Sequence, residues 1–439
     1  MARGTFSGGI HPYYGKELSK DQPTKTLIPK NDLVYPLTQH IGSPAKPLVE
    51  KGDKVLVGQK IAEACGDTSA CVISSVSGIV KSVEPRMTAS GSKIESIVVE
   101  NDNEYAAVED FGKKRDYTKL SKKEIRAIIK EAGIVGMGGA GFPTHIKLTP
   151  VDDQKIEYVI VNGAECEPYL TSDYRMMLEE PERLITGLKI ILRLFENAQG
   201  IIAIEDNKPE VIEKMKALVE NEPKITVRVA KTKYPQGGER TLIYAMTGRK
   251  INSSMLPQDV GCIVNNVDTV ISIALAVAES TPLIRRIITV SGDAVQQPSN
   301  FVVPTGMAYS ELIEAAGGFR QQPKKLLSGG PLMGTALYTL DVPVTKVSSA
   351  LLAFTQDDVE DMPESPCIRC GRCVAVCPGQ IVPKKMMETV KRNDTEGFEK
   401  LYGLECCECG CCAYVCPSGI RLTQAFKQMK RSIHAEHNK

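Results

Sequence analysis

The chain has 439 residues, and its 54 lysines and arginines nearly balance its 53 aspartates and glutamates, which leaves a formal net charge of +1. This balance gives no argument for a nucleic-acid partner. No apolar run approaches the ~20 residues that a membrane-spanning helix needs, and the first residues lack the apolar core of a signal peptide. We therefore expect neither a transmembrane helix nor a signal peptide, and we expect the chain to lie on the cytoplasmic side of the cell.

The first hundred residues predict an extended arm and then a small β domain. Residues 1–30 are rich in Gly, Pro and Lys and show no sustained period. Residues 31–104 alternate short β-type runs with turn signals, a pattern that resembles the barrel-sandwich hybrid fold of biotinyl and lipoyl carriers. A carrier presents a lysine at a hairpin tip, but the corresponding turn here, 74–78, contains no lysine. We therefore expect a structural domain, followed by a charged linker.

The middle of the chain predicts an α/β domain, which we place at 115–282. Ser121 and Glu124 form a capping-box pattern at the start of a helix expected to end near Gly133. From about 155 to 280, β-type runs alternate with helical ones, which indicates a largely parallel sheet. The apolar run at 270–277 predicts a buried helix.

The rest of the chain divides into three segments. Residues 283–335 predict a small α+β module, residues 336–360 a connector, and residues 361–439 a cysteine-rich segment with a basic helical tail. The predicted fold class is therefore multidomain, with α/β and α+β parts and a helical C-terminal region.

Ten of the 14 cysteines lie between Cys367 and Cys416. A secreted disulfide-stapled protein is not expected at this length with cysteines this localised, so the cluster indicates metal. Two runs with the spacing C-x2-C-x2-C-x3-C-P begin at Cys367 and Cys406. In this pattern three cysteines wrap one 4Fe–4S cluster and the fourth reaches the neighbouring cluster. The predicted ligands are Cys367, Cys370, Cys373 and Cys416 for cluster one, and Cys406, Cys409, Cys412 and Cys377 for cluster two.

The alternative for these cysteines is a pair of structural zinc sites. Zinc prefers two C-x2-C knuckles per ion and has no use for the Cys-Pro ending, so we favour two 4Fe–4S clusters. Cys407 and Cys411 are surplus and are expected to be buried thiols near the clusters. The scattered cysteines, Cys166 among them, are expected to be small buried residues.

The stretch GMGGAGFPTHIK, at 136–147, contains the letters G-x-G-x-x-G. A Rossmann dinucleotide site requires a strand before the loop, and here a predicted helix precedes it, so this interpretation is disfavoured. The glycines still indicate close backbone approach to an anion, with Lys147 as a cation nearby. A flexible surface loop is the alternative, but Phe142-Pro143 is an odd choice for a solvated linker.

This loop resembles the FMN loop in the NADH-binding flavoprotein subunit of respiratory complex I. The stretches VNGAECEP, YPQGGERTL and VNNVDT match the same family in the same order, and the module VSGDAVQQPSNFVVPTGMAYSELIEAAGG resembles its β-grasp (SLBB) domain. With the opening FSGGIHPYYGKELS, the carrier-like domain and the two ferredoxin-type runs, essentially the whole chain resembles the RnfC family of the Rnf electron transport complex.

The resemblance implies a set of binding residues. For FMN they are Gly136, Gly138, Gly139, Gly141, Lys147, Asn162, Tyr234, Gly237, Gly238, Asn265, Asn266 and Thr269. For NADH they are Phe142, Glu167 and Glu239. Two positions depart from the complex I pattern, because Ala164 stands where an Asp is expected and Gly238 where a Glu is expected.

The resemblance also implies a function. The chain would be the peripheral NAD(H) subunit of a ferredoxin:NAD+ oxidoreductase coupled to Na+ or H+ translocation, passing electrons between NADH, FMN and two 4Fe–4S clusters on the cytoplasmic face of the cell membrane. Its partners would be the other Rnf subunits, both membrane-integral and ferredoxin-like, and indirectly ferredoxin. Hydride transfer needs no protein acid or base, so no catalytic side chain is expected, and Glu239 is a hypothesis only.

Two other functions remain open from the sequence. One is a cobalamin (corrin) reductase of a bacterial microcompartment, which shares the flavin, the clusters and the layout. The other is a non-enzymatic electron-transfer scaffold, in which the flavin domain is degenerate and only the iron–sulfur clusters work.

Overall fold

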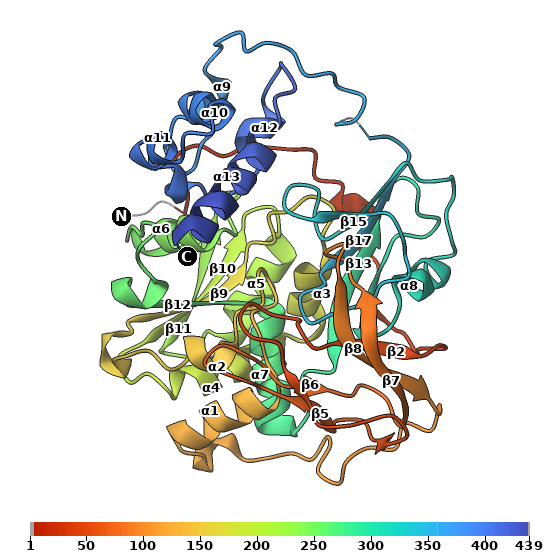
Figure 1. Ribbon diagram of the computed structural model, residues 1–439. Coiled ribbons are helices and arrows are strands. Elements are labelled where there is room, and N and C mark those ends of the chain that lie inside the picture. Colours follow the sequence, from red (N-terminus) through yellow and green to blue (C-terminus); the bar gives the residue numbers. More distant parts are fainter. Residues whose placement is uncertain (1–3, 358, 438–439) are drawn as a thin grey trace.

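The computed structural model describes residues 4–357 and 359–437. Its parts follow one another along the chain, and the blue C-terminal helices lie above the α/β part in Figure 1. No helix in the described ranges is both long enough and apolar enough to cross a membrane.

The N-terminal β domain consists of two antiparallel sheets around a small apolar core that includes Leu33, Tyr35 and Ile97. One sheet has the order β2-β8-β7-β4 and the other β3-β5-β6. Ser75 in the turn at 74–78 is buried, shares a hydrogen bond with the Tyr35 hydroxyl and donates to the Thr305 carbonyl. This turn is therefore packed into the protein and not a mobile tip. The strands are β2 (Leu33–Pro36), β3 (Lys46–Pro47), β4 (Lys54–Val55), β5 (Lys60–Glu63), β6 (Val72–Ile73), β7 (Gly78–Met87) and β8 (Lys93–Asn101).

The α/β domain contains a parallel four-stranded sheet in the order β11-β10-β9-β12, which agrees with the largely parallel sheet that the sequence indicates. Its strands are β9 (Tyr158–Gly163), β10 (Gln199–Glu205), β11 (Ile225–Ala230) and β12 (Cys262–Asn266). Its helices are α1 (Lys122–Glu131), α2 (Thr144–Lys147), α3 (Ser172–Glu179), α4 (Pro181–Leu192), α5 (Pro209–Leu218), α6 (Glu239–Thr247) and α7 (Val267–Glu279). The Ser121–Glu124 capping box begins α1 as predicted, and α7 is the predicted buried helix.

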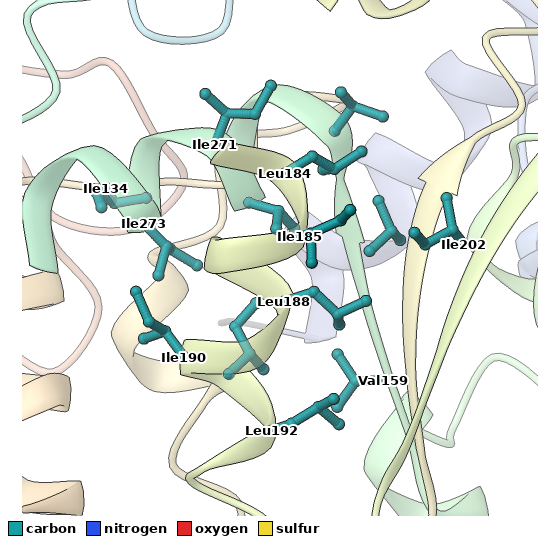
Figure 2. Packing of buried hydrophobic residues seen from close by; sticks show 14 of the residues in the cluster. Ile134, Val159, Leu184, Ile185, Leu188, Ile190, Leu192, Ile202, Ile271 and Ile273 are labelled. Carbon is teal, nitrogen blue, oxygen red and sulfur yellow. The ribbon is translucent and has the colours of Figure 1, made fainter. Parts of the chain in front are cut away.

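The core of this domain packs helix α4 against the sheet. Figure 2 shows the apolar side chains of α4 packed between α7 and the sheet, with Leu188 facing Val159. Leu184 and Leu188 stand four residues apart, so they lie on one face of the helix. Each such fully buried side chain stabilises the fold by about 1.5–3 kcal/mol. The strands β9 and β12, which carry predicted FMN contacts at their carboxyl ends, therefore contribute to this packed core through Val159, Val161 and Ile263.

The third part is a six-stranded sheet in the order β1-β14-β13-β17-β15-β16, with helix α8 (Tyr309–Ala315). The segment at 336–360 is more than the connector that we expected, because β17 lies between β13 and β15. Its apolar run at 350–354 is buried and pairs on both sides, which a solvated connector would not do. The strands are β1 (Lys25–Thr26), β13 (Arg285–Ser291), β14 (Ser299–Pro304), β15 (Lys325–Ser328), β16 (Thr335–Leu337) and β17 (Ala350–Phe354).

The C-terminal part is helical and is built around Phe398 and Phe426. Its helices are α9 (Arg372–Ala375), α10 (Pro383–Lys391), α11 (Thr395–Lys400), α12 (Cys411–Tyr414) and α13 (Leu422–His437). Short 3-10 turns complete the chain at η1 (Lys16–Leu18), η2 (Tyr117–Lys119), η3 (Asp153–Lys155), η4 (Pro257–Val260) and η5 (Gly403–Glu405).

Candidate functional site

The carboxyl ends of β9 and β12 bring three of the predicted FMN contacts together. Asn266 lies opposite Asn162 in the parallel register, and Asn265 precedes it. Ligands of open α/β sheets bind at this edge. The side-chain amide of Asn162 donates to the Gly237 carbonyl at 2.8 Å, which joins the strand ends to the YPQGGER loop.

The glycine loop lies over the same edge. The Met137 amide donates to the Thr269 hydroxyl at 3.0 Å, at the start of α7. A Cβ atom built on Gly138 would stand 3.1 Å from Cβ of Asn266. The loop follows α1 and is followed by the short helix α2, so it lacks the preceding strand of a Rossmann turn.

The glycines of this loop have different roles. Gly136 closes the loop, because its amide donates to the Phe142 carbonyl at 2.8 Å. Gly141 has φ +72°, and a Cβ there would lie 2.7 Å from Val347, so its role is to fit the fold. Gly138 and Gly139 are exposed, and a Cβ on Gly139 would meet no described atom within 4 Å. The loop thus presents bare backbone to open space.

Two buried side chains near this edge carry unpaired polar atoms. The Asn265 Nδ2 atom and both amide atoms of Gln236 have no hydrogen-bond partner in the described chain. An unsatisfied buried polar group costs about 1–3 kcal/mol, so a ligand with donors and acceptors would relieve this cost. Gln236 was not among the predicted contacts, although its position between Pro235 and Gly237 in the YPQGGER stretch was a signal. These orphaned groups and the bare glycine backbone fit a flavin nucleotide.

Lys147 and Glu239 form an ion pair at 3.1 Å, and Lys147 also donates to the Val264 carbonyl at 2.9 Å. The pair therefore joins a residue predicted for FMN to one predicted for NADH. Gly238 caps α6, which begins at Glu239. Phe142 is half-buried in the glycine loop.

Glu167, the third residue predicted for NADH, binds the backbone of another loop. Its carboxylate accepts hydrogen bonds from the amides of Leu332 (3.1 Å) and Met333 (2.9 Å). Burial raises the pKa of Glu167 to about 7. Within the described residues no hydrogen bond or ion pair joins Glu167 to Phe142 or Glu239, and the polar contacts of Glu167 are instead with the 332–333 backbone.

The two departures from the complex I pattern are occupied by local structure. Ala164 is buried, its amide donates to Asn162 Oδ1, and its carbonyl accepts from Lys208. A Cβ on Gly238 would stand 2.8 Å from the Thr241 hydroxyl. Neither position offers a carboxylate to a ligand.

The cysteines of both runs come together across the helical part. A small cavity is lined by Cys377 of the first run and by Cys406, Cys409 and Cys412 of the second. Burial raises the pKa of Cys373, and the nearby Cys367 and Cys416 thiols raise it further. Cys370 is exposed. Apart from Cys370, these groupings bring together the residues predicted for each crossed ligand set.

The described residues contain no group of three or more His, Cys, Asp or Glu side chains arranged around a single metal ion. A 4Fe–4S cluster does not need one, because its four thiolates bind four different iron atoms. The cavity between the cysteines and the donor set of thiols fit such a cluster.

The prediction that both surplus cysteines are buried is only partly right. Cys411 is buried as expected, but Cys407 is exposed. Among the scattered cysteines, which we expected to be buried, Cys166 is buried but Cys65, in the β domain, is exposed. Apolar periodicity does not mark single cysteines in loops, so the sequence could not separate these cases.

The YPQGGER loop, residues 234–240, and the second cysteine run touch directly. The Tyr234 hydroxyl donates to the Cys409 carbonyl at 2.8 Å. The Gly237 amide donates to the Cys166 sulfur at 3.2 Å, and Cys166, Tyr234, Cys409 and Cys411 share one apolar cluster with Ile10. Tyr234, predicted to line the flavin, therefore lies between the two parts of the protein.

Comparison with protein families matches four models in the predicted order. They are the RnfC barrel sandwich hybrid domain (4–104), the Nuo51 FMN-binding domain (129–275), the SLBB domain (287–336) and the 4Fe-4S dicluster domain (366–420). These matches confirm the predicted fold class.

Curated relatives extend over most of the chain. It is 45% identical to a component of the proton-translocating ferredoxin:NAD(+) oxidoreductase complex of Clostridium ljungdahlii, over 87% of this chain and 83% of the relative. It is 40% identical to the corresponding component of the Na(+)-translocating complex of Acetobacterium woodii, over 100% and 99%. Among solved structures, the NAD+-reducing [NiFe]-hydrogenase in its air-oxidized state shares the fold, with a TM-score of 0.52 and 19% identity over 74% of this chain and 68% of that one.

Proposed function

The chain belongs to the RnfC family of Rnf complex components, and from this premise we propose that it is the NAD(H)-oxidising or -reducing subunit of an Rnf-type ferredoxin:NAD+ oxidoreductase. It is an electron-transfer protein with an FMN-binding domain and a 4Fe–4S dicluster domain. The observation that carries the proposal is the direct contact between the YPQGGER loop, which holds predicted FMN contacts, and the second cysteine run, through Tyr234 and Cys409.

The residues at the sheet edge would hold FMN. Bound FMN supplies the chemistry that the clusters lack, because a flavin accepts a hydride as two electrons and releases single electrons. The exposed backbone of Gly138 and Gly139 would face its phosphate and ribityl chain. The unpaired amides of Asn265 and Gln236 would supply hydrogen bonds to its polar edge.

NADH would dock beside the glycine loop, on the side of Phe142. Glu239 stands at the rim of this region and is held by Lys147. Its role would be to orient the nicotinamide or ribose without taking a proton, since hydride transfer leaves no proton on the protein. Glu167 is committed to the 332–333 backbone, so we assign it to positioning the loop between the flavin and the clusters.

Cluster two would be the cluster nearer to FMN. Cys409, one of its predicted ligands, accepts the Tyr234 hydrogen bond, and the neighbouring Cys411 packs against the same tyrosine. Two of the predicted ligands of cluster one, Cys367 and Cys370, are exposed. Electrons from NADH would therefore pass from FMN to cluster two and then to cluster one, which faces outward toward a partner.

The partners would be the other Rnf subunits, membrane-integral and ferredoxin-like, with ferredoxin reached indirectly. The chain would lie peripherally on the cytoplasmic face of the membrane and contribute to coupling with Na+ or H+ movement. The names of the relatives support both ions, one each.

Anaerobic reconstitution tests this proposal. We expect stoichiometric FMN and about eight irons per chain, and co-purification with membrane subunits of the complex from native cells. Iron without FMN would leave only the scaffold function, and co-purification with a diol dehydratase shell instead would favour a cobalamin reductase.

A further inference from the structure

The N-terminal strap, residues 4–16, lies between the flavin domain and the cluster domain. In Figure 1 this red segment runs along the blue C-terminal helices, as the hydrogen bond from Gly9 to Val376 requires. The sequence predicted only an extended arm for these residues. Their contacts show a more specific placement.

On one side the strap pairs with the YPQGGER loop. Ile10 and Tyr234 exchange two backbone hydrogen bonds, at 2.8 and 2.9 Å, as in an antiparallel bridge. Lys233 holds the strap from the same side, because its ammonium donates to the carbonyls of Phe6 and Gly8 and lies 4.0 Å from the centre of the Phe6 ring. The strap is thus paired with the YPQGGER loop by an antiparallel bridge.

On the other side the strap meets the backbone of a predicted cluster-two ligand. The Gly9 amide donates to the Val376 carbonyl at 2.8 Å. Gly8 has φ +81°, and a Cβ there would stand 2.8 Å from the Cys377 carbonyl oxygen and 2.9 Å from that of Val376. Only glycine fits, since both the backbone conformation and the space exclude a side chain.

The far end of the strap anchors the loop that follows β9. Lys16 is buried, and its ammonium donates to the carbonyls of Glu165 (2.8 Å), Glu167 (3.0 Å) and Leu170. This loop holds Glu165 and Tyr169 at positive φ, 40° and 67°. One continuous segment therefore grips Tyr234, Cys377 and the Cys166 loop together.

We propose that the N-terminal strap is a positioning element that docks cluster two against the flavin site, with Gly8 as the residue that sets the fit. This inference rests on the proposed electron route from FMN to cluster two. It adds that the distance along this route is fixed by a segment far from both in sequence, and that the strap touches neither NADH nor the reacting atoms.

Gly8→Ala is the direct test, and Gly91→Ala is its matched control. Gly91 has nearly the same backbone angle, φ +78°, but a Cβ there would meet no described atom within 4 Å. A milder second variant, Lys233→Met, removes the ammonium that holds the strap. Its control is Lys231→Met, which loses only an exposed contact with Asp206.

Two measurements are made on the reconstituted full chain. Amide hydrogen exchange reports whether Gly9, Ile10 and Tyr234 remain protected. Photochemical reduction of the bound flavin, which needs no NADH, then starts electron transfer to the clusters, followed by absorbance and by EPR. We expect both strap variants to exchange faster at these amides and to reduce the clusters on the order of 10- to 100-fold more slowly, as displacement of reacting groups does, while both controls match the unaltered protein.

Unchanged exchange in the strap variants would overturn the proposal, and so would faster exchange with an unchanged rate of cluster reduction. If Gly8→Ala does not fold, Lys233→Met decides by the same two readouts. Failure of the proposed function is distinguishable, because it would appear as a lack of flavin reduction by NADH in the unaltered protein, whereas the strap is judged without NADH.

Discussion

The hydroxyl of Tyr234 donates a hydrogen bond to the backbone carbonyl of Cys409 at 2.8 Å, across the boundary between the flavin domain and the cluster domain. Tyr234 is almost fully buried. Burial also raises its pKa, so the hydroxyl keeps its proton and remains a donor. This hydrogen bond joins the YPQGGER loop, which holds predicted FMN contacts, to a predicted cluster ligand.

Tyr234→Phe is expected to loosen this boundary. The ring still fills its space, but the Cys409 carbonyl loses its partner in a buried setting, which costs about 1–3 kcal/mol. Thermal unfolding should show a lower midpoint, with faster amide exchange around 409–411. Tyr402→Phe, at an exposed tyrosine, is the control and should change neither. Equal midpoints for the two variants would contradict the structural role of the bond.

If the two clusters share ligands between the runs as we predict, each cysteine controls a defined cluster signal. Cys377→Ser should lose the cluster held by Cys406, Cys409 and Cys412, although it lies in the other run. The iron content should fall from about eight to about four per chain, and EPR should show one remaining cluster. Cys411→Ser should keep about eight irons, because Cys411 is not a predicted ligand. Loss of the other cluster in Cys377→Ser would show that each run binds its own.

Substitutions at two positions of the glycine loop should distinguish an effect on FMN binding from an effect on folding stability. Gly139→Ala meets no described atom, so the free energy of unfolding of the FMN-free protein should change by less than about 0.5 kcal/mol. FMN affinity should fall about tenfold or more, or roughly 1.4 kcal/mol, because the new methyl group occupies the cradle. Gly141→Ala should instead lower stability by about 1–3 kcal/mol. A Gly139→Ala protein with unaltered FMN affinity, measured by fluorescence titration, would place the phosphate elsewhere.

Asp173 gives the protein a pH dependence with a definite sign. Burial, with Glu165 and Asp268 nearby, raises its pKa to about 8, and Asn266 donates to its carboxylate at 2.6 Å. The folded state therefore holds a proton that the unfolded chain has lost above its ordinary pKa near 4. This contribution is fully present below pH 4 and is lost as the pH rises toward 8, at up to about 1.4 kcal/mol per pH unit.

Asp173→Asn tests this sign, because the amide resembles the protonated acid. Unfolding midpoints measured from pH 5 to pH 8.5 should fall less steeply with pH than in the unaltered protein. Asp110→Asn, at an exposed aspartate, is the control and should keep the original slope. An unchanged slope in Asp173→Asn would mean that Asp173 is ionised in the folded protein.

The sequence predicted most of the architecture because its signals are local. Alternating periods located the parallel sheet and the Ser121–Glu124 pattern located α1, whereas the ligand sets that follow from the spacing of the cysteines stay a prediction. The placement of β17 between β13 and β15 was not predictable, since strand order depends on pairing between residues more than fifty positions apart.

The candidate site shows the same division. The residues at the sheet edge follow from the strand ends and the family resemblance. The unpaired amide of Gln236, the position of Glu167 against the 332–333 backbone and the strap at Gly8 depend on tertiary contacts. A single sequence records no such contacts, so these residues were missed or given a different role.

We propose that electrons from NADH reach the clusters only through FMN, and this route can be tested directly. It is tested by anaerobic NADH titration of the reconstituted chain, with and without FMN, followed by flavin absorbance and cluster EPR. We predict that NADH bleaches the flavin and reduces the clusters when FMN is bound, and that the clusters stay oxidised in the FMN-free protein. Cluster reduction by NADH without FMN, or an FMN-loaded protein that NADH does not reduce, would rule out this electron route.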